Sequence, residues 1–233
     1  KGKDMGEIKG TTRVCGLIGN PVGHSISPVI HNTLADLCGI DMVYTTFKVE
    51  KGAVDTAVKG AHALDILGLN VTVPHKQEVI GALESVDPLA EAIGAVNTLV
   101  RTEHGYKGYN TDILGLEREL IDEGVVLLGS RCVILGAGGA ARAIAFLCAK
   151  SGAKEIYMLN RTKEKTYDIA KAVNDYFGKE CIKPMLISEY DKLEADDYVV
   201  IQTTSVGLYP NVDDVVIHDE AFYKKVKVGV DII

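Results

Sequence analysis

Residues 133–147 read VILGAGGAARAIAFL, a short apolar run joined to an amphipathic helical run by a cluster of glycines. Gly136, Gly138 and Ala141 have the G-x-G-x-x-G/A spacing of dinucleotide-binding turns. In such turns the first glycine permits a tight bend, the second lets the backbone approach a pyrophosphate, and the small third residue packs helix on strand. The helix N-terminus then offers unpaired N–H groups to the phosphates. A plain strand-to-helix turn is the alternative, but the flanking strand and helix favour a Rossmann-type domain.

Around this turn, short β-rich runs alternate with helical patterns, which is typical of an α/β chain with largely parallel sheets. In the first half we predict strands at 13–19, 42–49, 66–73 and 95–101, and helices at 28–38, 52–64, 75–83 and 88–93. A polar, hairpin-like stretch follows, and the pattern restarts with strands predicted at 131–136, 155–160, 183–187, 197–203 and 226–233. We therefore predict two domains that meet near residues 112–125.

The composition describes a soluble globular protein, with 47% apolar and 24% charged residues in a chain of 233. It contains no apolar run of the roughly 18 residues that a membrane span needs, and its N-terminus lacks the apolar core of a secretion signal. Five widely spaced cysteines without a C-x-x-C argue against a disulfide framework or a metal site and favour a reducing cytoplasm. The formal charge of −7 disfavours nucleic acid as a partner.

The end of the strand at 155–160 distinguishes NADP from NAD. An NAD-binding domain usually has an acidic residue there, which accepts hydrogen bonds from the ribose hydroxyls. This chain has Asn160, Arg161 and Thr162 instead, with Lys163 close behind. A guanidinium can bind a 2′-phosphate bidentately, whereas a carboxylate would repel it. NADP is therefore the expected cofactor, although a solvated basic loop would have the same sequence.

A second polar loop, QTTSVGLYP at 202–210, follows the strand at 197–203. Thr203, Thr204, Ser205 and Gly207 would lie at the carboxyl end of a parallel strand, where open α/β sheets bind ligands. These residues would face the nicotinamide. An ordinary polar turn fits the spacing almost as well.

The stretch LNVTVPHK at 69–76 alternates apolar and polar residues. Because strand side chains alternate between faces, we expect Leu69, Val71 and Val73 to face the core. Asn70 and Thr72 would then face a cleft whose ligand satisfies them. Lys76 is predicted to begin a helix, where a cation is unfavourable for the helix dipole, so a function for it is favoured over simple solvation.

Further polar residues flank the predicted helices of the first half. Ser27 is expected to be the N-cap of the helix that begins near Pro28. Ser25 is not needed for that cap, and both hydroxyls could hold a substrate carboxylate at the helix N-terminus. Asn97 and Asp112 lie in Gly-bounded polar segments, and Asp112 could equally be a helix N-cap.

Taken together, these segments resemble the shikimate dehydrogenase family in order and spacing over essentially the whole chain. The matching motifs are S-x-S-P at 25–28, N-V-T-x-P-x-K at 70–76, G-A-x-N-T at 94–98, G-x-N-T-D at 108–112, G-A-G-G-A at 136–140 and N-R-T at 160–162. The resemblance implies NADP-linked, reversible reduction of 3-dehydroshikimate to shikimate in aromatic amino-acid biosynthesis. It implies an N-terminal α/β substrate domain with a mainly parallel sheet at 1–112, a connecting helix at 113–124 and a Rossmann-type NADP-binding domain at 125–233.

The resemblance also assigns roles to residues. Lys76 and Asp112 would be the catalytic pair. The substrate-binding residues would be Ser25, Ser27, Asn70, Thr72 and Asn97. The cofactor-binding residues would be Gly136, Gly138, Gly139, Ala140, Asn160, Arg161, Thr162, Thr204 and Ser205. The partner would be a small-molecule substrate, and the assembly a monomer or homodimer.

Two departures from the family pattern stand out. Gln202 and Thr203 occupy positions where the family usually has Asn and Ala. The sequence also ends on an apolar strand without a covering helix, so we expect that its natural C-terminal portion, with a Tyr and a Gln of the pocket, is missing. Three alternatives remain open: an NAD-using quinate/shikimate dehydrogenase, a non-catalytic ligand-binding homologue, and a methyltransferase that uses the glycine-rich turn.

Overall fold

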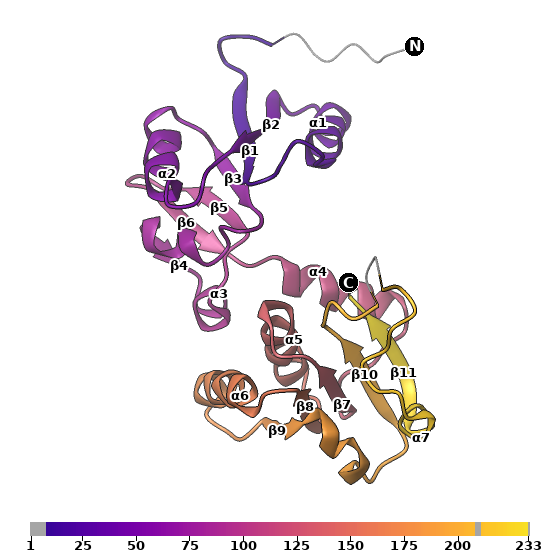
Figure 1. The fold of residues 1–233 in the computed structure, drawn as a ribbon. Coiled ribbons are helices and arrows are strands. Elements are labelled where there is room, and N and C mark those ends of the chain that lie inside the picture. The colour runs from indigo at the N-terminus through magenta and orange to yellow at the C-terminus, as the bar shows by residue number, and fades with distance from the viewer. Residues whose placement is uncertain (1–7, 208–210, 233) are drawn as a thin grey trace. The chain divides into compact units, whose positions relative to one another are not determined.

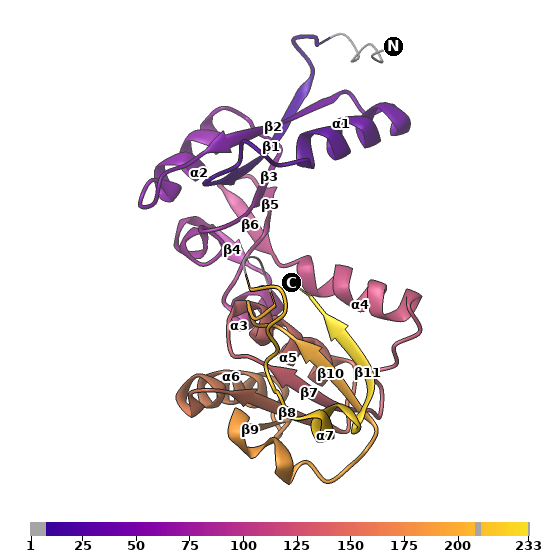
Figure 2. The ribbon, with the colours of Figure 1, turned by 45° about the vertical axis from the view of Figure 1, so that its right-hand side comes forward.

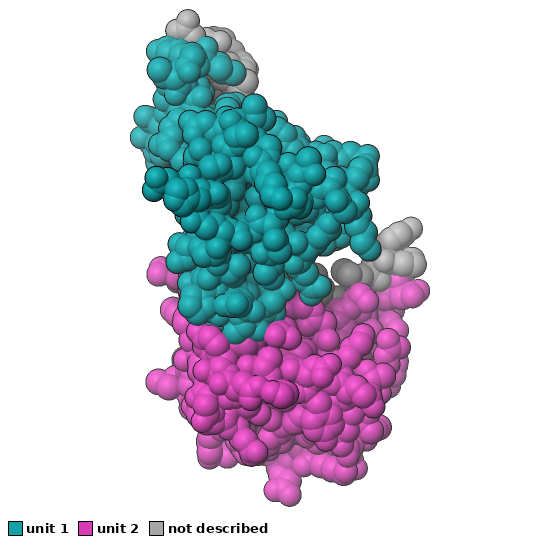
Figure 3. Space-filling view, turned by 90° about the vertical axis from the view of Figure 1, so that its left-hand side faces the viewer, with its two compact units in different colours: residues 1–111 teal, residues 112–233 magenta. Residues whose placement is uncertain are grey.

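The computed structural model describes residues 8–207 and 211–232 (Figure 1). The chain divides into two compact units, residues 1–111 and residues 112–233 (Figure 3). Each unit has its own sheet and its own buried core. None of the helices in the described part of the chain is long and apolar enough to cross a membrane.

The first unit contains a six-stranded sheet in the order β2-β1-β3-β5-β6-β4. Its strands are β1 (Arg13–Gly19), β2 (Met42–Lys48), β3 (Gly68–Val71), β4 (Ser85–Val86), β5 (Thr98–Arg101) and β6 (Tyr106–Tyr109). The pairs β1–β2, β1–β3 and β4–β6 are parallel, while β5 runs antiparallel to both β3 and β6. The predicted hairpin is therefore the β5–β6 pair.

Helical segments connect strands of this sheet along the chain (Figure 1). They are α1 (Ser27–Cys38), α2 (Val54–Ala63), α3 (Pro88–Ile93) and the 3₁₀ helix η1 (Glu78–Ala82). Val58 of α2 packs with Leu69 and Val71 of β3 in the main core of the unit, and all three side chains are buried. Apolar burial of this kind is the main favourable term in folding, so α2 is held by the apolar face of β3.

Two predictions around β3 are wrong. Val73 does not face the core but is 68% exposed, because β3 ends at Val71 and the alternation of a strand no longer applies beyond it. The expected helix at 75–83 is a turn followed by the short η1, so Lys76 precedes the helix. The carbonyl of Lys76 accepts a hydrogen bond of 2.8 Å from the backbone N–H of Val96 in a neighbouring segment. The helix-dipole argument for Lys76 therefore does not hold.

The second unit contains a five-stranded, entirely parallel sheet in the order β11-β10-β7-β8-β9. Its strands are β7 (Arg131–Leu135), β8 (Glu155–Asn160), β9 (Ile182–Leu186), β10 (Tyr198–Gln202) and β11 (Val226–Asp231). Its helices are α4 (Asp112–Asp122), α5 (Gly139–Lys150), α6 (Lys163–Phe177), α7 (Glu220–Tyr223) and the 3₁₀ helix η2 (Ile187–Lys192). The predicted alternation of strands and helices is confirmed here.

Both faces of this sheet are covered, as expected for parallel strands. Figure 2 shows α5 and α6 running beside β7, β8 and β9. Val133 and Leu135 of β7 pack with Leu193 and Phe222 in a separate buried cluster that includes residues of η2. Residues of β7 after Arg131 are buried without interruption, which explains why this strand reads as a continuous apolar run.

The strand order has a switch point between β7 and β10. The chain proceeds from β7 through α5 to β8 and through α6 to β9, and then places β10 on the opposite side of β7. In open α/β sheets, ligands bind outside the carboxyl ends of the strands at such a point. The glycine-rich turn after β7 and the loop after β10 meet there.

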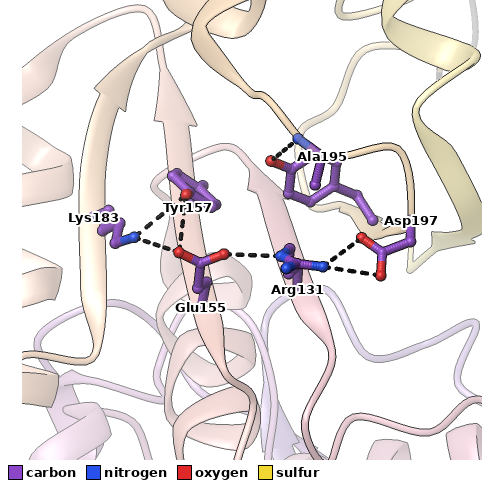
Figure 4. A network of polar contacts seen from close by, with 7 residues as sticks. Arg131, Glu155, Tyr157, Lys183, Ala195 and Asp197 are labelled. Atoms are coloured by element: carbon purple, nitrogen blue, oxygen red, sulfur yellow. Dashed lines mark hydrogen bonds and ion pairs between the residues drawn. The ribbon is translucent and has the colours of Figure 1, made fainter.

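The opposite, amino-terminal ends of these strands carry a network of ion pairs (Figure 4). The Arg131 guanidinium donates hydrogen bonds to Glu155 at 3.0 Å and to Asp197 at 2.9 Å. Lys183 lies 2.7 Å from the other oxygen of Glu155. This network joins three strands at the edge away from the switch point, so we interpret it as structural.

Candidate active site

The glycine-rich turn has the geometry that its sequence predicts. Gly136 has φ +117°, a conformation that residues with a Cβ rarely adopt. A Cβ built there would lie 2.6 Å from the Thr203 hydroxyl oxygen, so only glycine fits. Ala141 is fully buried in α5, as expected for the small residue that packs the helix on the sheet.

The start of α5 is open toward solvent. Gly138 is the N-cap, and no side chain caps the helix. Gly138, Gly139 and Ala140 are exposed, and a Cβ at either glycine would meet nothing within 4 Å. Uncapped N–H groups at a helix N-terminus favour an anion. The space in front of the helix and the donors that border it therefore suit a pyrophosphate.

The loop after β10 closes one side of this turn. The Thr203 hydroxyl donates a hydrogen bond of 2.6 Å to the carbonyl of Leu135, the last residue of β7. The Gln202 amide oxygen accepts from the Thr204 N–H and hydroxyl, at 3.1 and 3.0 Å. Its amide nitrogen donates to the Val206 carbonyl at 3.0 Å. The two residues that depart from the family pattern thus order the loop, while Ser205 is exposed.

The end of β8 presents an amide, a guanidinium and a hydroxyl. Asn160 donates hydrogen bonds to the carbonyl and hydroxyl oxygens of Thr162, at 3.0 and 3.1 Å. Thr162 is the N-cap of α6 without a side-chain cap bond, and Arg161 is exposed. Lys163 lies 3.5 Å from Glu189, which partly neutralises it. Arg161 and the N-terminus of α6 are therefore the elements here best suited to an anion.

Polar residues gather around Asn70 in the first unit. The Tyr44 hydroxyl donates a hydrogen bond of 2.7 Å to the Asn70 amide oxygen. The Asn70 amide nitrogen donates to the Thr98 hydroxyl at 3.3 Å. Burial raises the pKa of Tyr44 to about 12, so the phenol is a neutral donor at physiological pH. Protein groups, and not a ligand alone, therefore satisfy Asn70.

Tyr44 was not among the predicted site residues. Its partner Asn70 lies on β3, and β1 separates the two strands. The local sequence places Tyr44 in a β-rich run and gives no further signal. Sequence reasoning cannot place such a contact without the sheet order.

Asn97 joins two segments of the first unit. Its amide oxygen accepts hydrogen bonds from the Thr111 N–H at 2.9 Å, the Thr111 hydroxyl at 3.0 Å and the Thr98 hydroxyl at 2.9 Å. These bonds fix the segment that leads to Asp112. Asn97 therefore has a structural role in addition to any contact with substrate.

The predicted N-cap of α1 is wrong. Ser27 is the first residue of α1, Ile26 is the N-cap, and no side chain caps the helix in the usual geometry. The Ser25 hydroxyl oxygen instead accepts from the Ser27 N–H at 3.2 Å and lies 3.1 Å from the Ser27 hydroxyl. The two serines are thus adjacent at the start of α1, as predicted, and Ser25 takes over part of the capping role.

Thr72 and Lys76 belong to the segment that follows β3. The Thr72 methyl packs against Gly19, because a Cβ at that glycine would lie 2.3 Å from it. Lys76 is partly exposed in the turn before η1. Asp112 is the first residue of α4 and belongs to the second unit, so the catalytic pair stays a prediction. Within the described residues, no group of three or more side chains is arranged to hold a metal ion.

Known proteins resemble this chain along most of its length. A family model described as the shikimate dehydrogenase substrate binding domain matches residues 17–99, and one described as shikimate / quinate 5-dehydrogenase matches residues 120–232. The shikimate dehydrogenase (NADP(+)) of Moorella thermoacetica is 42% identical over 215 residues, which cover 90% of this chain and 72% of that protein.

Solved structures give the same result. A shikimate dehydrogenase in complex with NADP+ is 34% identical with a TM-score of 0.81, over 99% of this chain and 88% of that one. The shikimate 5-dehydrogenase of Listeria monocytogenes, in complex with shikimate and NAD, is 31% identical with a TM-score of 0.84. That match covers 92% of this chain and 76% of the other.

The parallel sheet with its switch point, the glycine with positive φ at the turn and the uncapped start of α5 together define an α/β protein of the dinucleotide-binding class. Both family models describe shikimate dehydrogenases, and they match separate parts of the chain. The chain belongs to the shikimate dehydrogenase family.

Proposed function

We propose that this protein catalyses the reversible, NADP-dependent reduction of 3-dehydroshikimate to shikimate. The observation that carries the cofactor choice is the end of β8, where Arg161 and Thr162 stand in place of an acidic residue. The relative from Moorella thermoacetica is named as an NADP(+) enzyme. A guanidinium beside a helix N-terminus suits the 2′-phosphate that distinguishes NADP from NAD.

The chain offers suitable groups for each part of the cofactor. The exposed glycines at the start of α5 would hold the pyrophosphate, with Gly136, Gly138, Gly139 and Ala140 forming the turn. Asn160, Arg161 and Thr162 would hold the adenosine phosphate. Thr204 and Ser205 would border the nicotinamide. When bound, NADPH supplies the hydride, and the groups of this chain bind, orient and protonate the substrate.

The first unit would bind the hydroxylated ring acid. Ser25 and Ser27 offer two hydroxyls near the N-terminus of α1 for the carboxylate. Asn70, Thr72 and Asn97 would contact the ring hydroxyls. Tyr44 fixes the Asn70 amide oxygen as an acceptor, so the amide nitrogen, which donates to the Thr98 hydroxyl at 3.3 Å, is the donor of that side chain.

Reduction of the ketone creates an alkoxide that needs a proton. Lys76 would deliver it, because a lysine ammonium is a proton donor at neutral pH. Asp112 would orient the ammonium and bind a ring hydroxyl. In the oxidising direction the same lysine must first lose its proton, so the rate of shikimate oxidation is expected to rise with pH.

We assign the two proposed binding roles to separate domains. Residues 1–112 would form the substrate domain, residues 113–124 a connecting helix, and residues 125–233 the NADP-binding domain. The boundary between the compact units at 111 and 112 is compatible with this division. A non-catalytic homologue would have no need of a proton donor at position 76.

The test is a direct assay of the purified protein with shikimate. NADP and NAD are supplied at equal concentration, and formation of reduced cofactor is followed by its near-ultraviolet absorbance. We expect turnover with NADP and much slower turnover with NAD. Faster turnover with NAD, or with quinate in place of shikimate, would support the quinate/shikimate alternative. Binding of both ligands without turnover would support the non-catalytic alternative.

A further inference from the structure

His75 precedes Lys76 in the turn before η1, and its side chain is fully buried. Its Nε2 atom lies 2.8 Å from the backbone carbonyl oxygen of Val49, the residue after β2. Because a carbonyl can only accept a hydrogen bond, Nε2 must carry a proton. This contact ties the turn that carries Lys76 to the loop between β2 and α2.

The other ring nitrogen of His75 faces a carboxylate. Among the buried side-chain nitrogen and oxygen atoms in the part of the chain that the structure describes, Nδ1 of His75 is the one without a hydrogen bond. It lies 3.4 Å from Oε2 of Glu78. If the ring were neutral with its proton on Nε2, a lone pair and a carboxylate oxygen would face each other without a proton between them. Buried polar atoms are rarely left in this state.

Glu78 is itself held in place. Its other oxygen, Oε1, accepts a hydrogen bond of 2.9 Å from the backbone N–H of Gly52. The side chain is 35% exposed, so the carboxylate also stays in contact with solvent. Glu78 therefore cannot simply turn away from His75 without losing the Gly52 contact.

A further acidic group acts on the same imidazole. Glu50 in the loop after β2 interacts electrostatically with His75, while it pairs with Lys48 at 2.7 Å and accepts from Asn20 at 2.8 Å. The residue after His75 in the sequence is the cation Lys76. Carboxylates from the loop after β2 and from η1 therefore both act on the imidazole.

We propose that a proton lies between Nδ1 of His75 and Glu78, and that this ion pair positions the turn that presents Lys76. Nε2 of His75 fixes the turn to Val49, Glu78 fixes it to Gly52, and the Lys76 carbonyl fixes it to Val96 at 2.8 Å. His75 is thus a positioning residue, which acts through Lys76. The consequence for catalysis rests on the proposed role of Lys76, whereas the location of the proton does not.

Glu78→Gln is the most informative variant. A glutamine oxygen can still accept from the Gly52 N–H, and its amide nitrogen can donate to Nδ1, so the geometry is kept without a proton on Nδ1. Glu50→Gln is the matched control, because it removes a nearby carboxylate that does not contact Nδ1. The ring ¹⁵N chemical shifts of His75, measured by NMR at neutral pH, report which nitrogen carries a proton.

We expect wild type and Glu50→Gln to give an imidazolium pattern for His75, with both nitrogens protonated. Glu78→Gln should give a neutral ring with the proton on Nε2. A wild-type spectrum with an unprotonated Nδ1, equal to that of Glu78→Gln, would overturn the proposal. This result is independent of the assay for shikimate oxidation.

Kinetics test the positioning role. His75→Leu removes both contacts and should lower kcat about 10-fold or more, since small displacements of a catalytic group are costly. KM for NADP should stay unchanged, because His75 belongs to the first unit. His75→Gln supplies an amide donor for Val49 and should recover part of the rate. Equal losses in His75→Leu and His75→Gln, with altered KM for NADP, would contradict the positioning role.

The two proposals can fail separately. If Lys76→Ala kept normal turnover while His75 was an imidazolium, the role of Lys76 would be wrong and the ion pair right. If His75→Leu did not fold, Glu78→Gln and the wild-type spectrum would still decide where the proton lies.

Discussion

The Thr203 hydroxyl and the Leu135 carbonyl oxygen are joined by a hydrogen bond of 2.6 Å that links the end of β7 to the loop after β10. The Thr203 N–H donates to the same carbonyl at 3.0 Å. A Cβ at Gly136 would lie 2.6 Å from the same hydroxyl oxygen. The buried Thr203 side chain therefore packs against the glycine-rich turn and holds it at the switch point of the sheet.

Thr203→Val keeps the shape of this side chain but replaces the hydroxyl with a methyl group. Loss of the hydrogen bond should lower the free energy of unfolding by about 1 kcal/mol and weaken NADP binding, because the turn loses its support. Thr203→Ser keeps the hydroxyl and should bind NADP nearly as wild type does. Calorimetric titration of both variants measures the effect, and equal affinity of Thr203→Val and wild type would exclude a supporting role.

Arg161→Ala tests the choice of cofactor. Loss of a charge-assisted contact with the 2′-phosphate should raise KM for NADP by about 10- to 100-fold. KM for NAD should hardly change, because NAD lacks that phosphate. Lys165→Ala, which removes an exposed cation at the third residue of α6, is the control. If both variants raised KM for NADP equally, a diffuse basic surface would explain the preference better than a specific contact.

Tyr44→Phe removes the donor that orients the Asn70 amide. The amide would then have no fixed orientation toward the substrate, and KM for shikimate should rise about 3- to 10-fold, the cost of one hydrogen bond. Tyr106→Phe is a matched control, since its hydroxyl donates to the Ile66 carbonyl in the core at 2.7 Å. We expect Tyr106→Phe to lower stability but leave KM unchanged. An unchanged KM in Tyr44→Phe would remove Asn70 from the substrate site.

The same tyrosine makes stability depend on alkaline pH. Burial raises the pKa of Tyr44 to about 12 in the folded protein, above the ordinary value of about 10. The unfolded chain therefore releases this proton first, and the stability that the neutral phenol contributes is fully present below pH of about 10 and is lost as pH rises toward 12. The free energy of unfolding, measured with denaturant across this pH range, should fall less steeply in Tyr44→Phe than in wild type. Parallel declines in both proteins would show that Tyr44 ionises normally.

The parts of the site that depend on local sequence could be predicted. The turn at Gly136 and the buried Ala141 follow from spacing, because a strand, a tight turn and a helix N-terminus are formed by consecutive residues. The alternation of Leu69, Asn70 and Val71 across β3 also follows from local geometry. These features need no knowledge of which strands are neighbours.

The remaining parts depend on contacts between distant segments. The segment at 75–83 has a helical pattern, but the Lys76 carbonyl pairs with Val96 and only η1 forms. In the sequence Asn70 has no evident hydrogen-bond partner, but in the folded chain the Tyr44 hydroxyl of β2 lies 2.7 Å from its amide oxygen. His75 could be identified as titratable, but the Val49 and Glu78 contacts that surround it come from the folded chain. Pairing between segments, and not propensity, decides these positions.

The central claim, that Lys76 is the proton donor of an NADP-dependent shikimate dehydrogenase, is tested most directly by the steady-state kinetics of Lys76→Ala with shikimate and NADP. Lys59→Ala, which removes an exposed lysine paired with Asp55 on α2, is the control. We predict that kcat of Lys76→Ala falls about 10²- to 10⁴-fold, while KM for shikimate changes little and Lys59→Ala behaves as wild type. Turnover of Lys76→Ala at the wild-type rate would contradict the account.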